Sequence, residues 1–182
     1  MENIIPLYTP KLTLLTGTPK RTQAIMRSAL VWTAGKTPVD CLVGGNRFDP
    51  TKLAYAISEQ YPAAYQALLN QIKVGRAFTC YEMLRLLRET DANTPFPRLI
   101  FDLLSTYADE SVNDDEVNRL MAQTTQQLQR LRGAGPLLVS AHPHATRPHL
   151  LNVLMNMADE IIALDAEPEA ELHTAHVQER ML

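Results

Sequence analysis

The sequence has few of the features that mark secreted, membrane or zinc-binding proteins. Among 182 residues there are only two cysteines, Cys41 and Cys80, and they form no C-x-x-C pair. Neither a disulfide framework nor a cysteine-based zinc site is therefore indicated. No stretch reaches the roughly 18 consecutive apolar residues that span a bilayer, and the N-terminus lacks the charged and apolar regions of a signal peptide. We expect a cytoplasmic protein without membrane association.

A large excess of charge of either sign is also missing. The formal net charge is −3, which gives no general attraction for nucleic acid or for an anionic membrane. A hydrophobic content of 46% in a chain of this length supplies enough apolar surface for one sizeable core. The composition predicts a single globular domain.

Short apolar runs alternate with helical patterns along the chain. We expect strands over 12–16, 39–43, 73–78, 98–104, 136–141 and 160–164, the last in the middle of the sheet. Between them we expect helices over 22–33, from Pro50 with Asp49 as its N-cap, and over 62–71, 81–88, 114–132 and 149–157. This alternation predicts an α/β fold, a three-layer α/β/α sandwich with a mainly parallel sheet. Residues 1–165 would form one domain, and 166–182 a C-terminal tail or an antiparallel edge strand.

Residues 12–26, LTLLTGTPKRTQAIM, have the layout of a phosphate-binding P-loop, G-x-x-x-x-G-K-[ST], read from a strand into a helix. Gly17 takes the first position. Thr22 then replaces the second glycine, Gln23 replaces the lysine that reaches the phosphates, and Ala24 replaces the hydroxyl that ligates Mg²⁺. The segment keeps the motif's layout while losing the residues that bind phosphate.

Two cations, Lys20 and Arg21, lie within the same loop. They could bring positive charge near a phosphate, but their offset differs from that of the P-loop lysine. Taken alone, the segment is more typical of an ordinary turn between a strand and a helix than of a P-loop.

Four later segments resemble the RecA/RadA-type recombinase ATPase core, in the order and spacing of that family. VDCLVGGNRFDPTKLAYAI is similar to the second strand and the F-x-P helix start, and IKVGRAFTCYEMLRLL to the A-R-A-F strand with its helix. RLIFDLL resembles the Walker B strand, with Asp102 at the acidic position. LLVSAHP resembles the sensor strand, where His142 stands in place of a polar residue that is often Gln. The resemblance implies a RecA-like P-loop NTPase fold with a degenerate Walker A motif.

The same resemblance implies that ATP hydrolysis is lost. The F-x-P alignment puts Gly45 where the family carries the acid that positions the attacking water. Asp102 would hold Mg²⁺ through water but would have no hydroxyl partner at Ala24. The acidic segment 109–116 would repel a triphosphate. We expect no catalytic residue and no resident cofactor, and we assign a vestigial nucleotide-binding set: Gly17, Lys20, Arg21, Thr22, Gln23, Ala24, Asp102 and His142.

DNA binding and metal binding receive little support. The first candidate DNA loop is acidic, and the second, HPHATRPH, has Arg147 as its only fully charged residue. Its histidines lack cysteine or carboxylate neighbours, so no metal site is expected. Other basic residues could still cluster after folding: Lys20, Arg21, Arg27, Lys52, Lys73, Arg76, Arg85 and Arg88.

Two functions remain open. The favoured one is a non-hydrolysing RecA-like module that binds a protein partner or another copy of itself, linked by the resemblance to DNA recombination or repair. The alternative is a divergent ATPase or nucleotide-binding protein of the same family, with Lys20 or Arg21 in the role of the missing lysine and with ATP and Mg²⁺ as ligands. The joint loss of lysine, hydroxyl and base favours the first.

Overall fold

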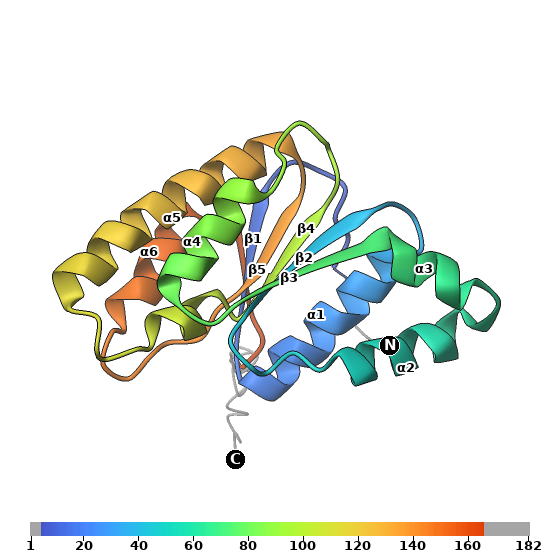
Figure 1. The fold of residues 1–182 in the computed structure, drawn as a ribbon, viewed down its shortest axis with the longest axis horizontal. Helices are drawn as coiled ribbons and strands as arrows, with labels where there is room; N and C mark the ends of the chain where they lie inside the picture. The colour runs from blue at the N-terminus through green and yellow to red at the C-terminus, as the bar shows by residue number, and fades with distance from the viewer. Residues whose placement is uncertain (1–4, 166–182) are drawn as a thin grey trace, which may run out of the picture.

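The structure is a computed structural model that describes residues 5–165. These residues form a parallel β-sheet with helices on both faces (Figure 1). The strand order is β3-β2-β4-β5-β1-β6, and every neighbouring pair is parallel. The strands are β1 Leu12–Thr16, β2 Val39–Gly44, β3 Ile72–Ala77, β4 Arg98–Phe101, β5 Leu137–Ser140 and β6 Glu160–Ala163. The predicted three-layer α/β/α fold is confirmed.

Helices cover both faces of the sheet (Figure 1). One layer holds α1 Pro19–Ala34, α2 Pro50–Gln60 and α3 Tyr65–Gln71, and the other holds α4 Cys80–Glu89, α5 Asp114–Ala134 and α6 His149–Met157. Two short 3₁₀ turns complete the set, η1 Pro62–Ala64 and η2 Leu103–Tyr107. Within residues 5–165, no helix combines the length and apolar character needed to cross a membrane.

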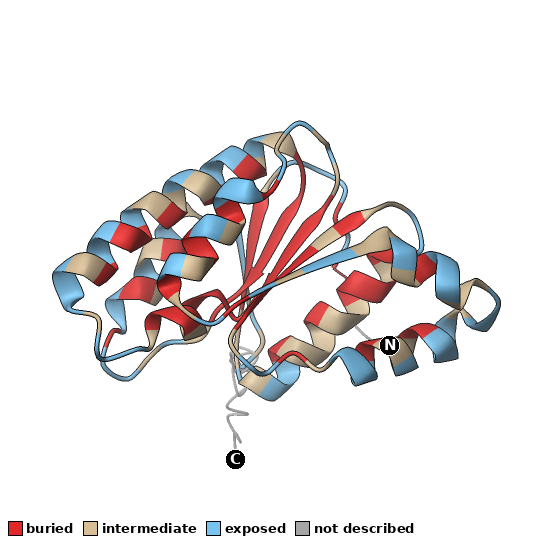
Figure 2. Cartoon of the chain, viewed as in Figure 1, coloured by how far each residue is buried: buried red, intermediate tan, exposed pale blue. Residues whose placement is uncertain are grey.

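Side chains of each strand divide between two cores, because successive strand residues point to opposite faces. Leu14 of β1 and Ile100 of β4 belong to the core under α4, α5 and α6, whereas Leu15 and Phe101 belong to the core under α1, α2 and α3. Figure 2 shows the inner strands buried along their length. Burial on both faces explains why these strands occur in the sequence as continuous apolar runs.

The start of α2 follows the predicted capping pattern. Asp49 Oδ1 accepts hydrogen bonds from the backbone N–H groups of Thr51 (2.9 Å) and Lys52 (3.3 Å), and Pro50 occupies the first turn. Such a cap satisfies N–H groups that have no partner inside the helix. The prediction of Asp49 as N-cap is confirmed.

Two expectations about strands are wrong. The strand expected over 98–104 ends at Phe101, because Asp102 enters the left-handed region (φ 51°). Its carbonyl oxygen then accepts hydrogen bonds from both the N–H and the Oγ of Ser105 (3.1 and 2.8 Å). The strand expected in the middle of the sheet over 160–164 is instead β6 at the edge of the described sheet, where Ile161 is 41% exposed. The tail or edge strand expected over 166–182 lies outside the described residues.

Candidate functional site

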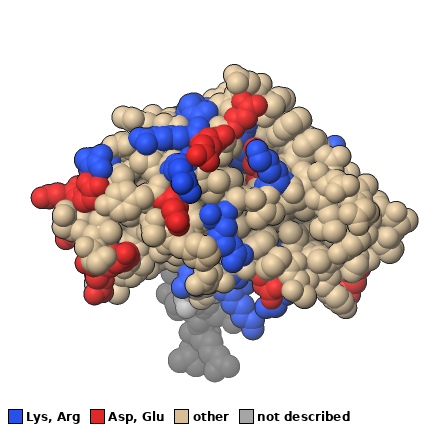
Figure 3. Space-filling model, viewed as in Figure 1, with Lys and Arg blue, Asp and Glu red and all other residues tan. Residues whose placement is uncertain are grey.

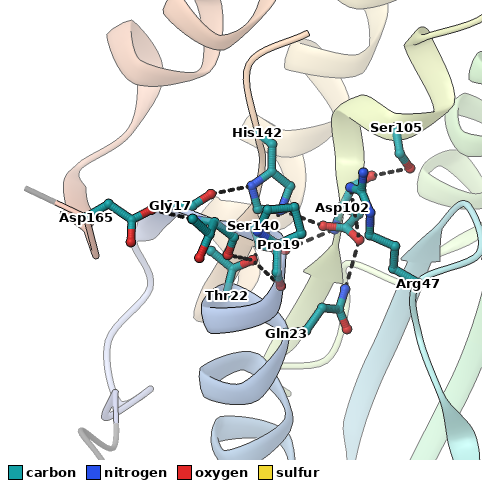
Figure 4. Close-up of polar contacts among 11 residues, drawn as sticks. Gly17, Pro19, Thr22, Gln23, Arg47, Asp102, Ser105, Ser140, His142 and Asp165 are labelled. Carbon is teal, nitrogen blue, oxygen red and sulfur yellow. Dashed lines mark hydrogen bonds and ion pairs between the residues drawn. The ribbon is translucent and has the colours of Figure 1, made fainter.

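The carboxyl ends of β4, β5 and β1 lie side by side, because β5 pairs in parallel with both of the other strands. Asp102 follows β4, His142 lies two residues beyond β5, and Gly17 follows β1, so these residues meet at one edge of the sheet. The first two turns of α1 add Thr22 and Gln23 (Figure 4). Open α/β sheets bind ligands at this edge, so the structure brings five of the predicted site residues together where a ligand would be expected.

Asp102 is the most enclosed acid of this site, with 1% of its surface exposed. Its Oδ2 accepts a hydrogen bond from Gln23 Nε2 (2.8 Å), and its Oδ1 lies 2.8 Å from His142 Nε2. The Asp102 backbone N–H donates to Ser140 Oγ (2.9 Å), and Arg47 Nη1 lies 3.9 Å from Oδ2. Both oxygens of the carboxylate are therefore engaged by the protein's own side chains.

His142 connects the ends of β1 and β4. Its Nδ1 lies 2.7 Å from the carbonyl oxygen of Gly17, which can only accept, so Nδ1 carries a proton. Its Nε2 faces Asp102 Oδ1 (2.8 Å) and Thr22 Oγ1 (3.1 Å). The contact between Nε2 and Oδ1 joins His142 directly to Asp102. The side chain is 12% exposed, which differs from the solvent-facing turn residue that is typical at a strand end.

The helix after β1 begins earlier than expected. The sequence pattern predicts its start at Thr22, but α1 begins at Pro19, and only Gly17 and Thr18 connect it to β1. Thr22 is fully buried within the helix, and its Oγ1 lies 3.1 Å from the carbonyl oxygen of Pro19. The expected positions of the second glycine, the lysine and the hydroxyl thus lie on a helix, and the long loop that would wrap phosphates does not form.

A carboxylate of the chain itself occupies the N-terminal end of α1. The side chain of Thr18, the N-cap residue, makes no capping bond; instead its backbone N–H donates to Asp165 Oδ2. Arg21 Nη1 donates to Asp165 Oδ1 (2.9 Å) and to the carbonyl oxygen of Leu164. A helix N-terminus favours an anion, and Asp165 takes that place here.

Gly17 has a structural role at the same point. Its φ is +147°, and a Cβ there would lie 3.0 Å from Leu164 Cβ and 3.1 Å from Asp165 Oδ2. The approach of the residues after β6 therefore requires a glycine. Close packing within the protein accounts for this residue without a phosphate.

The position expected for the water-positioning acid disfavours any residue other than glycine. Gly45 has φ +71°, and a Cβ there would lie 2.7 Å from Ser105 Oγ. The neighbouring Gly44 is equally restricted, because its Cβ would lie 2.4 Å from the carbonyl oxygen of Asp102. The turn after β4 thus fills the space into which a residue at position 45 would project.

Lys20 and Ala24 do not join the Asp102 cluster. They line a cavity of about 340 Å³ between α1 and the β2–α2 connection, together with Gln23, Arg27, Arg47, Asp49 and Lys52. The first turns of α1 therefore present Thr22 and Gln23 to the Asp102 cluster and a set of cations to this cavity.

Neither cysteine is suited to nucleophilic chemistry. Burial raises the pKa of the Cys41 thiol to about 12 and also raises the pKa of Cys80. Both are free thiols, and a raised pKa leaves little of the reactive thiolate at neutral pH.

The histidines near β5 have separate partners. His144 Nδ1 lies 2.8 Å from Thr146 Oγ1, and His149 Nε2 lies 3.0 Å from Asn118 Oδ1. Over residues 5–165, no group of three or more His, Cys, Asp or Glu residues is arranged to hold a metal ion. His173 and His176 lie outside the described part of the chain.

Comparison of the chain with models of protein families and with curated proteins gives no match in either case. The fold and the site define an α/β protein whose polar groups at the carboxyl edge of the sheet are paired with one another. Because such a fold carries many functions, function has to be argued from the site itself.

Sequence reasoning missed two charged residues of this region, Asp165 and Arg47. Asp165 follows β6, whose carboxyl end lies beside that of β1, so only the pairing of these strands brings it to α1. Arg47 lies in the β2–α2 connection and approaches Asp102 because β2 and β4 are neighbours. A correct strand order would have identified both.

Proposed function

We propose that this chain is a RecA-like module that has lost ATP hydrolysis and acts by binding, either to a partner protein or to another copy of itself. One observation carries the proposal, the hydrogen bond between Gln23 and Asp102. In an active P-loop enzyme the residues at these two positions face the phosphates and the Mg²⁺ ion. Here their polar groups are satisfied by each other.

The RecA-like part of the proposal is supported by where the resembling segments lie. The P-loop-like strand, the Walker B-like strand and the sensor-like strand are β1, β4 and β5, which are adjacent and end at the same edge. The link to DNA recombination or repair comes from the resemblance alone. We place the protein in the cytoplasm, where free thiols such as Cys41 and Cys80 persist.

Loss of hydrolysis follows from three occupied positions. Asp165 takes the anion position at α1, Gln23 bonds to Asp102, and the positive φ of Gly45 disfavours an acidic residue there. Phosphoryl transfer depends on positioning and on stabilisation of charge, and losing one such interaction costs about 3 kcal/mol of transition-state stabilisation. Their joint absence argues for a protein that binds without turnover.

The alternative ATPase depends on Lys20 or Arg21. Arg21 is paired with Asp165, so it would have to exchange that partner for a phosphate. Lys20 has no ion-pair partner among the described residues and lines the cavity beside α1. If the chain binds a nucleotide, the geometry favours Lys20 as the residue that contacts it. The experiment must therefore be able to detect nucleotide binding.

The test combines phosphate release with thermal unfolding in ATP, ADP and their Mg²⁺ complexes. We expect no Mg²⁺-dependent turnover above the rate of a protein-free blank. Saturable stabilisation without turnover would show nucleotide binding, because a ligand at 100 times its Kd stabilises a fold by about 2.7 kcal/mol. Mg²⁺-dependent turnover that Asp102→Asn abolishes would overturn the proposal.

A further inference from the structure

The carboxyl edge of the sheet has a second crevice beside the Asp102 cluster. The strands β2 and β4 are neighbours, but β2 continues into α2 on one face of the sheet and β4 continues through η2 into α5 on the other (Figure 1). A crevice opens where neighbouring strands send their helices to opposite faces, and open α/β sheets bind ligands at such points. The strands β1 and β5 form another such point, but the side chains of Gln23, Asp102 and His142 bond to one another there. The crevice between β2 and β4 is the one that remains open.

A cavity of about 540 Å³ lies at this crevice. The connections that follow β2, β3, β4 and β5 each contribute to its lining. Pockets that enclose small molecules have volumes of about 300–1,000 Å³. The cavity therefore has both the size and the position of a small-molecule site.

Phe78 gives this cavity an exposed aromatic ring. The residue is 55% exposed, and its backbone is held in place because its N–H donates to Glu82 Oε2 (2.8 Å) at the start of α4. Leu104 and Pro143 add apolar surface to the same lining. A flat apolar ligand that covers the ring would bury surface that water now contacts.

Arg47 brings a guanidinium group to the same cavity. Its side chain is 52% exposed, and within residues 5–165 its one ion pair, with Asp102 Oδ2, is 3.9 Å long, which is beyond hydrogen-bond distance. No Asp or Glu among those residues lines the cavity. Figure 3 shows blue Lys and Arg atoms at the lower middle of the view, on the side where the strands end. The N–H groups of Arg47 can therefore bind a carboxylate from outside, in the two-bond geometry that a guanidinium favours.

His144 adds a second donor, and its hydrogen bonds identify the tautomer. The backbone N–H of Thr146 donates to His144 Nδ1 (3.3 Å), so Nδ1 accepts and the proton of the imidazole lies on Nε2. In the part of the chain that the structure describes, both bonds of this imidazole are made by Nδ1. Since His144 lines the cavity, its Nε2–H is available to an oxygen of a ligand.

We propose that the cavity between the ends of β2 and β4 binds a small aromatic carboxylate. Phe78 packs against the flat apolar body, while Arg47 and His144 hold the carboxylate. Asp102 is 1% exposed and lies outside the lining, so the ligand meets donors and no acid. The site goes beyond the proposed function, because it requires neither a nucleotide nor a partner protein.

A nucleic acid fits this cavity less well. Arg47 is the only Lys or Arg among the described residues of the lining, whereas binding of a strand relies on several cations that neutralise phosphates. One guanidinium beside an apolar wall matches a ligand with a single negative charge.

The test is titration of the full chain with 2-naphthoate, followed by ligand-observed NMR. We expect saturable binding with a Kd of about 1 mM, the affinity that ordinary ligand efficiency gives for a molecule of this size. The compound 2-naphthalenemethanol has the same rings without the charge. It should bind about fivefold more weakly, because it cannot form the ion pair with Arg47.

Two variants separate the contribution of the charge from that of the ring. Arg47→Gln should weaken 2-naphthoate about fivefold and leave 2-naphthalenemethanol unchanged, whereas Phe78→Ala should weaken both ligands by about fivefold. Lys52→Gln is the matched control, because Lys52 lines the neighbouring cavity of about 340 Å³ that also contains Arg47, but not this one. It should bind both ligands like the parent chain. Thermal unfolding shows that each variant is folded, and Arg47→Gln, at an exposed position, decides the outcome.

Three results would overturn the proposal. The first is the absence of saturable 2-naphthoate binding up to about ten times the expected Kd. The second is binding that Arg47→Gln leaves unchanged, or that Lys52→Gln weakens as much as Arg47→Gln does. The third is displacement of 2-naphthoate by an oligothymidine, because nucleic acid would then be the occupant. None of these results bears on ATP hydrolysis, which is measured separately by phosphate release.

Discussion

The side-chain amide of Gln23 donates a hydrogen bond to Oδ2 of Asp102, with 2.8 Å between nitrogen and oxygen. The two residues lie at the positions where the family resemblance expects a phosphate-binding lysine and a magnesium-binding acid. Nothing need enter between them for either group to be satisfied. This direct contact makes the carboxyl edge of the sheet a self-contained polar cluster.

Replacing Asp102 by Asn should destabilise the protein. Asparagine tolerates the left-handed backbone that Asp102 adopts, so the change reports mainly on hydrogen bonding. Its side-chain oxygen can still accept from Gln23, and its amide can donate to Nε2 of His142, so the change mainly replaces hydrogen bonds to a carboxylate by hydrogen bonds between neutral groups. We expect a loss of about 1 kcal/mol in the free energy of unfolding by urea titration, since a hydrogen bond to an ionised group is the stronger kind. Asp115→Asn, at an exposed position without a partner among residues 5–165, is the control and should change stability little; an unchanged Asp102→Asn would refute the role assigned to the cluster.

Asp165→Asn should convert the end of α1 into a site for external anions. The change frees Arg21 and the Thr18 N–H, which now hold the Asp165 carboxylate. We expect a stability loss below about 1 kcal/mol, because the pair is exposed, and a larger thermal stabilisation by phosphate than the parent chain shows at equal ionic strength. The double variant Arg21→Gln/Asp165→Asn should lose most of that gain. Equal responses of the parent and Asp165→Asn chains would contradict this assignment.

Gly45→Glu should destabilise the protein and should give no ATP hydrolysis. A side chain at position 45 meets Ser105 Oγ and must adopt a positive φ, so we expect a destabilisation of about 1–3 kcal/mol and no phosphate release. Combining it with Ser105→Gly removes the close contact but keeps the backbone cost, so the melting temperature should recover only in part. Full stability of Gly45→Glu would show that the turn after β4 leaves more space than the structure indicates.

Lowering the pH should remove the difference in stability between the parent chain and the Glu82→Gln variant. Its pKa is lowered, chiefly by the hydrogen bond from the backbone N–H of Phe78 and then by that from Thr79. A carboxyl group whose pKa is lower in the folded state than in the unfolded state stabilises the fold at pH values above its unfolded pKa, which is about 4.5. This stabilisation is lost as the pH falls through the pKa of the folded state. We expect Glu82→Gln to be less stable than the parent chain at neutral pH, and the difference to shrink below pH about 4. Thermal unfolding from neutral to acidic pH measures this, with exposed Glu89→Gln as the control; a difference that grows in acid would reverse the assigned sign.

Much of the fold was predictable because local patterns agree with the final packing. The apolar runs of β1, β2 and β5 and the Asp49–Pro50 cap give element bounds that lie within a residue or so of those observed. The wrong boundaries have local causes that only coordinates reveal. Leu103 and Leu104 are as apolar as a strand, but they lie in η2 because Asp102 turns the backbone.

The site was predictable as a set of residues but not as a set of contacts. The resemblance selected Gly17, Gln23, Asp102 and His142, and the parallel sheet brings all four together. It did not indicate that they bond to one another, because hydrogen-bond partners far apart in sequence depend on strand order. The spacing of residues in the sequence also could not predict that Lys20 lines a cavity together with three other cations.

The sequence by itself determined the alternation of strands and helices and the residue types at positions 22–24, where a threonine, a glutamine and an alanine stand in place of the glycine, lysine and hydroxyl of a P-loop. These properties depend on side-chain chemistry and on periodicity, which are local. Only the tertiary structure decided that Asp165 fills the anion position of α1, that Gln23 binds Asp102, and that a cavity opens between the ends of β2 and β4. The physical reason is that each of these relationships joins residues from different elements, whose distances are set by the order β3-β2-β4-β5-β1-β6.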